Sequence, residues 1–286
     1  MKQRGLGREG RLPSGRGPAL VAVGALSALS TACGGGLPLL HPAKTLPVGD
    51  VRAVAGFGAT IAVGSMASAV QQAEQDPNTT VSPPPSGDTA YAKGALVLAS
   101  VGPGLQPLAG ARVGIGQQFE GGLAYTGRAV RIDVRRSFDL SPSWSVSIGA
   151  GGEAALYGHQ EGSALPNVSL NQLHGWGADV PLLIGYESPG GLYMFWVGAR
   201  GGGEHVDISD VTSEPKAVTL GSPPISLSAT RFWGGGLVGL AVGFRHIHVA
   251  LELDAAYARI SGSYNDTNAT VAGVTLAPAT ALWWQF

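Results

Sequence analysis

Residues 246–258 read HIHVALELDAAYA, and this stretch decides the class of fold. Every second residue is apolar, and the residues between them are polar or small. Successive side chains of a β-strand point to opposite faces, so the alternation predicts a strand with one apolar and one polar face. The apolar face consists of Ile247, Val249, Leu251, Leu253, Ala255 and Tyr257, and the polar face carries His246, His248, Glu252 and Asp254.

The same alternation recurs along the chain and predicts about ten strands. Two of them leave an alternative open. In 120–138 the apolar phase changes near Gly127, which indicates a β-bulge or else a turn at 125–128. In 89–101 a short helix after Asp88 is the alternative to a strand. The predicted strands are 51–64, 89–101, 107–117, 120–138, 143–157, 174–187, 190–203, 228–244, 246–261 and 269–286.

The composition narrows the class of protein. Glycine supplies 45 of the 286 residues, and charged residues are only 13%, against a usual share of about 25%. The net charge of −1 argues against a nucleic-acid-binding protein, which needs a basic surface. The single cysteine excludes a disulfide framework and a zinc site built from cysteines.

The N-terminus predicts export from the cytoplasm. Residues 1–18 are basic, and the small apolar run that follows up to Ala32 is too short to span a bilayer but is typical of a signal peptide. The run Leu29-Ser30-Thr31-Ala32-Cys33 resembles a bacterial lipoprotein signal, although Ser30 stands where a bulky apolar residue is usual. The resemblance implies a signal peptide at 1–32, a lipid on Cys33 and a tether at 33–50. Ordinary cleavage after Ala32 is the alternative.

The connections and the C-terminus indicate a particular kind of barrel. Short connections near 102–106, 139–142, 188–189 and 245 alternate with longer ones at 65–88, 158–173, 204–227 and 262–268, and only 118–119 departs from the pattern. Leu282, Trp284 and Phe286 share one face of the last strand, which resembles the terminal signal that assembly machinery recognises in outer-membrane barrels. Residues 51–286 therefore resemble a bacterial outer-membrane β-barrel protein. The resemblance implies an all-β fold, a closed antiparallel transmembrane β-barrel of about ten strands, with eight as the alternative.

The polar faces of such strands point into the lumen, because an arginine that faces lipid at the midplane costs about 2–4 kcal/mol. Five arginines and five carboxylates have this placement, and a balanced set can pair in a low-dielectric interior. We expect Asp133 to pair with Arg112 or Arg200 rather than with an arginine of its own strand. A salt-bridged plug and the lining of a channel are the two interpretations. The predicted luminal residues are Arg112, Arg131, Asp133, Arg135, Glu153, Asp179, Arg200, Arg231, Glu252 and Asp254.

No catalytic or cofactor motif accompanies these patterns, so we expect a non-enzymatic protein without a cofactor. It would serve as a narrow channel, an envelope-structural protein or a surface-interaction scaffold. A surface hydrolase built from rim residues such as His205 and Asp207, and a lipid-tethered lipocalin-like binder, are the alternatives. The expected partners are outer-membrane lipid and lipopolysaccharide. The long loops are acidic and carboxylates suit divalent cations, with Glu204, Asp207 and Asp210 as candidate ligands.

Overall fold

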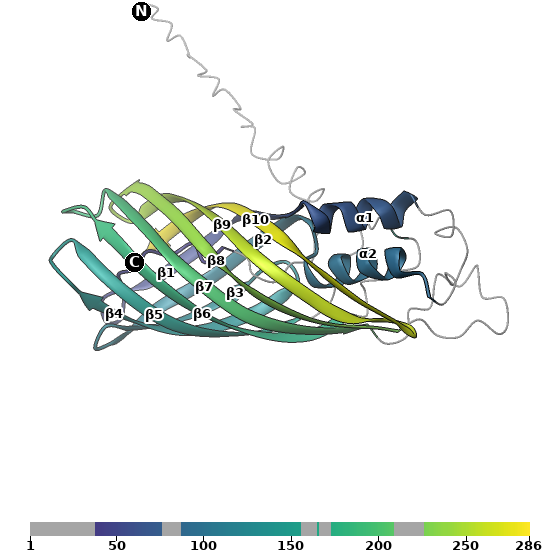
Figure 1. Cartoon of the computed structure of the whole chain (residues 1–286). Coiled ribbons are helices and arrows are strands. Elements are labelled where there is room, and N and C mark those ends of the chain that lie inside the picture. The colour runs from purple at the N-terminus through teal and green to yellow at the C-terminus, as the bar shows by residue number, and fades with distance from the viewer. Residues whose placement is uncertain (1–37, 76–86, 156–164, 166–172, 209–225) are drawn as a thin grey trace, which may run out of the picture.

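A computed structural model describes residues 38–75, 87–155, 165, 173–208 and 226–286. They form a closed antiparallel barrel of ten strands with two helices at one end (Figure 1). The strands are β1 (Val51–Val63), β2 (Gly104–Gly116), β3 (Phe119–Tyr125), β4 (Ala129–Asp139), β5 (Trp144–Ala155), β6 (Leu173–Glu187), β7 (Tyr193–Ile208), β8 (Leu227–Phe244), β9 (Ile247–Tyr264) and β10 (Thr267–Gln285), and the helices are α1 (Ser65–Gln75) and α2 (Thr89–Ser100). The predicted all-β closed barrel of ten strands is therefore confirmed, and the alternative of eight is wrong.

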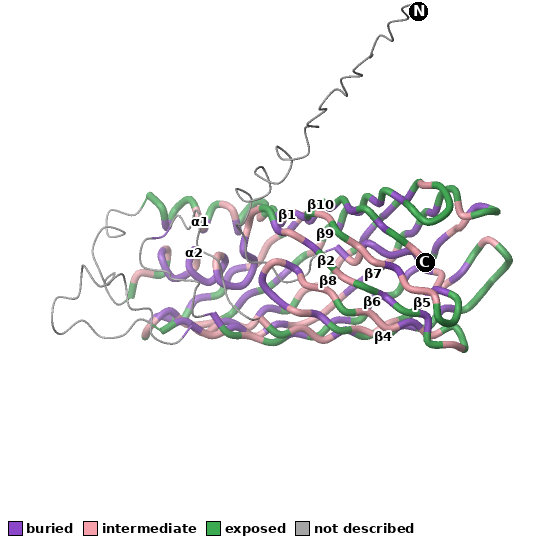
Figure 2. Tube along the Cα trace, turned by 180° about the vertical axis from the view of Figure 1, so that it is seen from behind, coloured by how far each residue is buried: buried purple, intermediate pink, exposed green. Residues whose placement is uncertain are grey.

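The barrel wall has an apolar exterior and a largely polar interior. Exposed and buried residues alternate along the strands (Figure 2), as on β9, where Leu251 and Leu253 are exposed and Glu252 and Asp254 are buried. A protein surrounded by water would have the opposite arrangement, because burying apolar area is the main favourable term in folding. The exterior is therefore suited to hydrocarbon.

The number of strands is right because two errors in the prediction cancel. Residues 89–101 form α2 rather than a strand. Asp88 caps this helix by accepting hydrogen bonds from the N–H groups of Ala90 and Tyr91 at 3.0 and 3.1 Å. Residues 120–138 form two strands, because a turn at 126–128 with Gly127 at φ 82° reverses the chain there. The bulge proposed near Gly127 is wrong, and the register shift lies between Gly114 and Gly116.

At one end of the barrel, which we call the tight-turn end, every connection is a tight turn. These turns join β2 to β3, β4 to β5, β6 to β7 and β8 to β9, so the connection at 118–119 fits the pattern after all. Gln117 and Gln118 both have positive φ, at 51° and 64°, as a two-residue hairpin turn of type I′ requires. The first and last strands also meet at this end, where Val51 and Phe286 exchange backbone hydrogen bonds. The connection at 102–106 instead lies at the opposite end, because it follows α2. The longer connection predicted at 262–268 is wrong: β9 continues to Tyr264 and β10 begins at Thr267, and a two-residue turn joins them at that opposite end.

The two helices form a cap at that opposite end, and we call them the helical cap (Figure 1). Helix α2 is buried on nearly all sides and packs inside the mouth against inward residues of β7 to β10, such as Ile260. Gly94 permits the close approach of α1, because a Cβ there would lie 2.4 Å from the Cβ of Ala73. Neither helix is long and apolar enough to cross a membrane.

Residues 38–50 run inside the barrel and end at the tight-turn end, where β1 begins. We call them the plug segment. Their contacts with the inner wall include hydrogen bonds from the N–H of Leu40 to Glu252 at 3.1 Å and from the N–H of Leu46 to Glu120 at 2.9 Å. Gly114 makes room for the segment, because a Cβ there would overlap the carbonyl oxygen of Pro47. Residues 38–50 are therefore part of the filled lumen and not a free tether.

Candidate functional site

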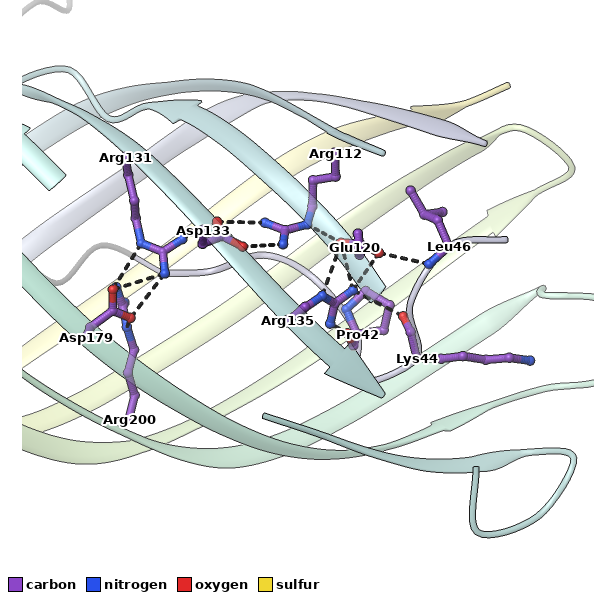
Figure 3. Close-up of polar contacts among 10 residues, drawn as sticks. All are labelled: Pro42, Lys44, Leu46, Arg112, Glu120, Arg131, Asp133, Arg135, Asp179 and Arg200. Carbon is purple, nitrogen blue, oxygen red and sulfur yellow. Dashed lines mark hydrogen bonds and ion pairs between the residues drawn. The ribbon is translucent and has the colours of Figure 1, made fainter. Parts of the chain in front are cut away.

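All ten residues predicted to be luminal lie on the inner side of the wall. Eight charged side chains among the described residues form one connected set in the middle of the barrel, which we call the luminal charge network, and Figure 3 draws seven of them. Six strands, β2, β3, β4, β6, β7 and β9, hold it in place. Its members are Arg112, Glu120, Arg131, Asp133, Arg135, Asp179, Arg200 and Asp254, which Arg200 contacts at 3.8 Å.

Glu120 joins the network to the plug segment. It is fully buried and accepts hydrogen bonds from Arg112 and from Arg135, whose Nη2 lies 2.9 Å from Oε2. Glu120 also accepts a hydrogen bond from the backbone N–H of Leu46, which belongs to the plug segment. Arg135 in turn donates to the carbonyl oxygens of Pro42 and Lys44. This ion pair therefore holds the segment through both its N–H and its carbonyl groups.

Asp133 and Asp179 each bind two arginines. Asp133 pairs with Arg112 from β2, as expected, and also with Arg131 from its own strand, which was not expected. Side chains two positions apart on a strand share one face, so a long arginine reaches its neighbour without leaving the wall. Asp179 accepts from Arg131 at 3.0 Å and from Arg200 at 2.6 Å. Arg200 therefore belongs to Asp179 and not to Asp133.

A second set of charges lies nearer the helical cap. Glu204 sits between Arg128 and Arg231, with N–O distances of 3.5 and 3.6 Å. Arg231 also donates a hydrogen bond of 3.1 Å to the carbonyl oxygen of Ser100, the last residue of α2. A cation at a helix C-terminus interacts favourably with the partial negative charge there. Arg231 thus fixes the inner end of α2 to the wall.

A third set lies toward the tight-turn end. Glu252 accepts hydrogen bonds from Trp196 Nε1 at 2.6 Å and from the first residues of the plug segment. Trp196 stacks on Trp283, with ring centroids 5.8 Å apart, and the guanidinium of Arg52 covers the Trp283 ring at 4.7 Å. Large aromatic rings therefore close the lumen beside the plug segment.

Sequence reasoning missed four of the luminal charges: Arg52, Glu120, Arg128 and Glu204. Leu123 faces outward and Glu120, three residues before it on the same strand, faces inward, so the parity of the apolar residues is the signal that could have found Glu120. Glu204 falls in the connection predicted at 204–227 but belongs to β7. Counted with these four, the described lumen carries seven arginines and seven carboxylates. The carboxylates are Glu120, Asp133, Glu153, Asp179, Glu204, Glu252 and Asp254.

Little space remains between these side chains. One cavity, lined by Pro38, Arg52 and Arg112 among others, has a volume of ≈ 30 Å³. Another, between Arg200, Trp233 and Asp254, has ≈ 10 Å³. A water molecule needs at least about 10–15 Å³, so each cavity holds about one or two waters at most. These two cavities therefore leave room only for isolated waters between the described side chains.

The candidate metal ligands are not brought together. Glu204 points into the lumen, whereas Asp207, three residues along the same strand, points outward, and Asp210 lies outside the described residues. Side chains at odd spacing on a strand face opposite sides, so these two carboxylates cannot bind one ion. Among the residues that the structure describes, no group of three His, Cys, Asp or Glu side chains could hold a metal.

The outer wall does bring two predicted rim residues together. His205 Nε2 lies 2.9 Å from Asp207 Oδ2, and His205 Nδ1 lies 2.9 Å from the hydroxyl of Thr230 on the neighbouring strand. His174 stands directly opposite Asp207 on β6. This is a hydrogen-bonded Thr–His–Asp chain on the outward face, near the end of the barrel that carries the helices.

The terminal residues Leu282, Trp284 and Phe286 lie together on the exterior, and each is about half exposed or more. They belong to the strand that closes the barrel against β1. Trp283, between them, points into the lumen and is buried. Cys33 and the signal peptide at 1–32 lie outside the described residues.

Comparisons with known proteins identify no family. No family model matches the chain, and no curated protein matches it. Solved structures with some similarity include the ferric enterobactin receptor PfeA, with 8% identity and a TM-score of 0.28, and the outer membrane phospholipase A of Escherichia coli, with 12% identity and a TM-score of 0.25. The matches cover 76% and 87% of this chain, and 32% and 93% of the two proteins. This chain thus spans about a third of the receptor. The chain is an all-β, closed, ten-stranded antiparallel barrel with an apolar exterior.

Proposed function

We propose that this protein is a non-enzymatic outer-membrane barrel with a closed lumen, which has an envelope-structural or surface-interaction role. The observation that carries the proposal is the filling of the lumen by three successive layers. The plug segment and the Trp196–Trp283 stack fill the tight-turn end, the luminal charge network fills the middle, and α2 fills the opposite mouth. Of the two interpretations of the luminal charges, a salt-bridged plug and the lining of a channel, this filling favours the plug.

The proposal includes a location and partners. Export by the signal peptide at 1–32, lipid attachment at Cys33 and insertion by the barrel assembly machinery would bring the chain to the bacterial outer membrane. Short turns face the periplasm in such barrels, so the helical cap would face the cell exterior. Outer-membrane lipid, lipopolysaccharide and divalent cations are the proposed partners on that side.

Conductance in a planar bilayer tests the closed lumen. The refolded wild type should show no stable current steps. A variant that lacks residues 38–46 should show them, because it loses the part of the plug segment that fills the lumen toward the tight-turn end. Val48→Ser is the matched control, since Val48 belongs to the same segment but is 71% exposed. Current steps of equal size in the wild type and in the deletion variant would contradict a closed lumen.

The Thr230–His205–Asp207 chain favours one second candidate, a hydrolase on the outer wall. In such a site Thr230 would be the nucleophile, His205 the base that accepts its proton and Asp207 the group that orients the imidazole. Ester hydrolysis of phospholipid in mixed micelles tests it, with His205→Ala expected to abolish the activity. His246→Ala is the control, because its ring binds the carbonyl oxygen of Gln285 at the opposite end. A wild type without hydrolysis would remove this candidate.

A further inference from the structure

The outward face of β8, β9 and β10 changes character along its length. On β9 the outward residues are apolar from Ile247 to Tyr257, and they are followed by Arg259, Ser261 and Ser263. A strand rises about 3.3 Å per residue and is tilted by about 40° in a barrel, which gives about 2.5 Å of depth per residue. The ten-residue step from Ile247 to Tyr257 therefore covers about 25 Å, the height of the apolar band of such barrels.

Aromatic residues mark both edges of this band. Phe244, Trp284 and Phe286 lie at the tight-turn edge, and Trp176, Phe232 and Tyr257 lie at the other edge, all well exposed. Aromatic girdles occupy the two interfaces of outer-membrane barrels. The row that contains Phe232 and Arg259, which face each other across β8 and β9, is therefore at the level of the outer-leaflet headgroups.

Beyond Arg259 the outward face is lined with hydroxyl and amide groups. Thr230, Ser261 and Thr270 form one row across the three strands, and Ser228, Ser263 and Asn268 form the next. Together with Gly262 and Ala269 they line a shallow depression of ≈ 480 Å³ on the surface. The depression lies beyond the aromatic edge, on the side away from the hydrocarbon, at the level of the saccharide layer of the membrane.

Arg259 is the cation at this boundary. It is exposed, and the described part of the chain offers it no ion pair or hydrogen bond. The other outward arginines of the described wall, Arg136 and Arg245, lie at the tight-turn end. Arg136 differs further because it stacks between Phe119 and Phe138 at about 5 Å. Of these outward arginines, Arg259 is therefore the one whose guanidinium is placed to bind a phosphate bidentately at the outer edge of the band.

On the hydrocarbon side of Arg259, a strip of the outer wall carries only small residues. A Cβ on Gly234 would meet nothing within 4 Å, so no packing constraint explains the absence of a side chain there. Gly236 and Ala255, one row further into the band, are also small. An acyl chain lying on this strip would meet backbone and small side chains between the exposed rings of Phe232 and Tyr257.

From this arrangement we propose that the outer face of β8–β10 binds the phosphorylated glycolipid of the outer leaflet, the membrane anchor of lipopolysaccharide. Arg259 binds a phosphate, the hydroxyl groups of Ser261 and Thr270 bind the sugar, and the acyl chains lie on the strip at Gly234. The site rests on the outer-membrane placement proposed above and assigns a binding surface to the lipopolysaccharide proposed there. It does not depend on a closed lumen.

Lipid binding by the full mature barrel in detergent tests the site, with native mass spectrometry as the readout. The probes are bisphosphorylated lipid A, the same glycolipid without its phosphates, and phosphatidylglycerol. The wild type should bind the phosphorylated glycolipid at least tenfold more tightly than either other lipid. Arg259→Gln should lose this preference, about a tenfold change, or 1.4 kcal/mol. Ser261→Ala with Thr270→Ala should weaken both glycolipids severalfold and keep the phosphate preference.

Arg136→Gln is the matched control, because it removes an outward arginine from the opposite edge of the barrel. It should bind all three lipids as the wild type does. Heat-modifiable migration in a detergent gel verifies that each variant is folded. Arg259→Lys keeps the positive charge, so it should keep part of the preference for the phosphorylated glycolipid. An Arg259→Gln protein that retains the full preference overturns the proposal, and so does a wild type that binds phosphatidylglycerol equally well. Conductance by the same wild type would instead contradict the closed lumen and leave this site standing.

Discussion

Glu120→Ala should be among the most destabilising single substitutions in the lumen. The change removes the one carboxylate that Arg135 contacts and also the acceptor of the Leu46 N–H. Arg112 keeps a second carboxylate, Asp133, whereas Arg135 keeps only the carbonyl oxygens of the plug segment. Removing one partner of a buried ion pair costs about 3–5 kcal/mol, because the remaining charge stays desolvated.

The midpoint of thermal unfolding measures this cost. For a chain of this size 1 kcal/mol corresponds to about 2–4 °C, so the Glu120→Ala barrel should unfold at least 6 °C below the wild type, and about 12 °C below it in the middle of the range. Glu187→Ala is the matched control. Glu187 binds Lys44 of the same plug segment at 3.4 Å, but the two side chains are 27% and 39% exposed, so its removal should cost less than about 1 kcal/mol.

The double variant Glu120→Ala/Arg135→Met separates a buried ion pair from a water-screened one. It should be more stable than Glu120→Ala alone, because the uncompensated guanidinium is gone. Strict additivity of the two single changes would refute the reasoning, and so would a loss below 1 kcal/mol for Glu120→Ala. Either result would mean that water reaches the luminal charge network and that the lumen is open.

Three further predictions concern the helical cap, assembly and processing. Gly94→Val should separate α1 from α2 and lower the unfolding free energy by at least about 1–3 kcal/mol, whereas Gly234→Ala, which meets no atom within 4 Å, should stay near the wild type in the same denaturant titration. Replacing Leu282, Trp284 and Phe286 with serine should leave an unclosed, protease-sensitive chain, because unpaired backbone groups in hydrocarbon cost several kcal/mol each. Asn268→Ala, on the same strand but beyond the apolar band, should assemble normally, and equal membrane levels of the triple variant would exclude a terminal assembly signal. Radiolabelled palmitate should be incorporated by the wild type and lost in Cys33→Ser, and a wild type without label would favour ordinary cleavage after Ala32.

The sequence alone determined the wall of the barrel. Alternation with a period of two, as in 246–258, gives each strand one apolar and one polar face, which is the pattern of a barrel with an apolar exterior. The same parity predicted which side Arg131, Asp133 and Arg135 occupy. These features are local, because they depend on the geometry of single strands and on the cost of exposing charge to lipid.

The contents of the lumen were decided only by the tertiary structure. Residues 89–101, predicted as a strand with a helix as the alternative, form α2, which is buried on nearly every side. A short apolar helix and a buried strand look alike in a sequence, so the pattern does not separate them. The plug segment carries no periodic signal, since its place depends on Glu120, Arg135 and Glu252, which come from three separate strands. The choice of ion-pair partner also depends on how far each arginine side chain reaches across the barrel. Arg200 contacts Asp179, and Arg131 contacts both Asp179 and Asp133 of its own strand. Contacts between residues far apart in the chain follow from register and closure, which no single strand specifies.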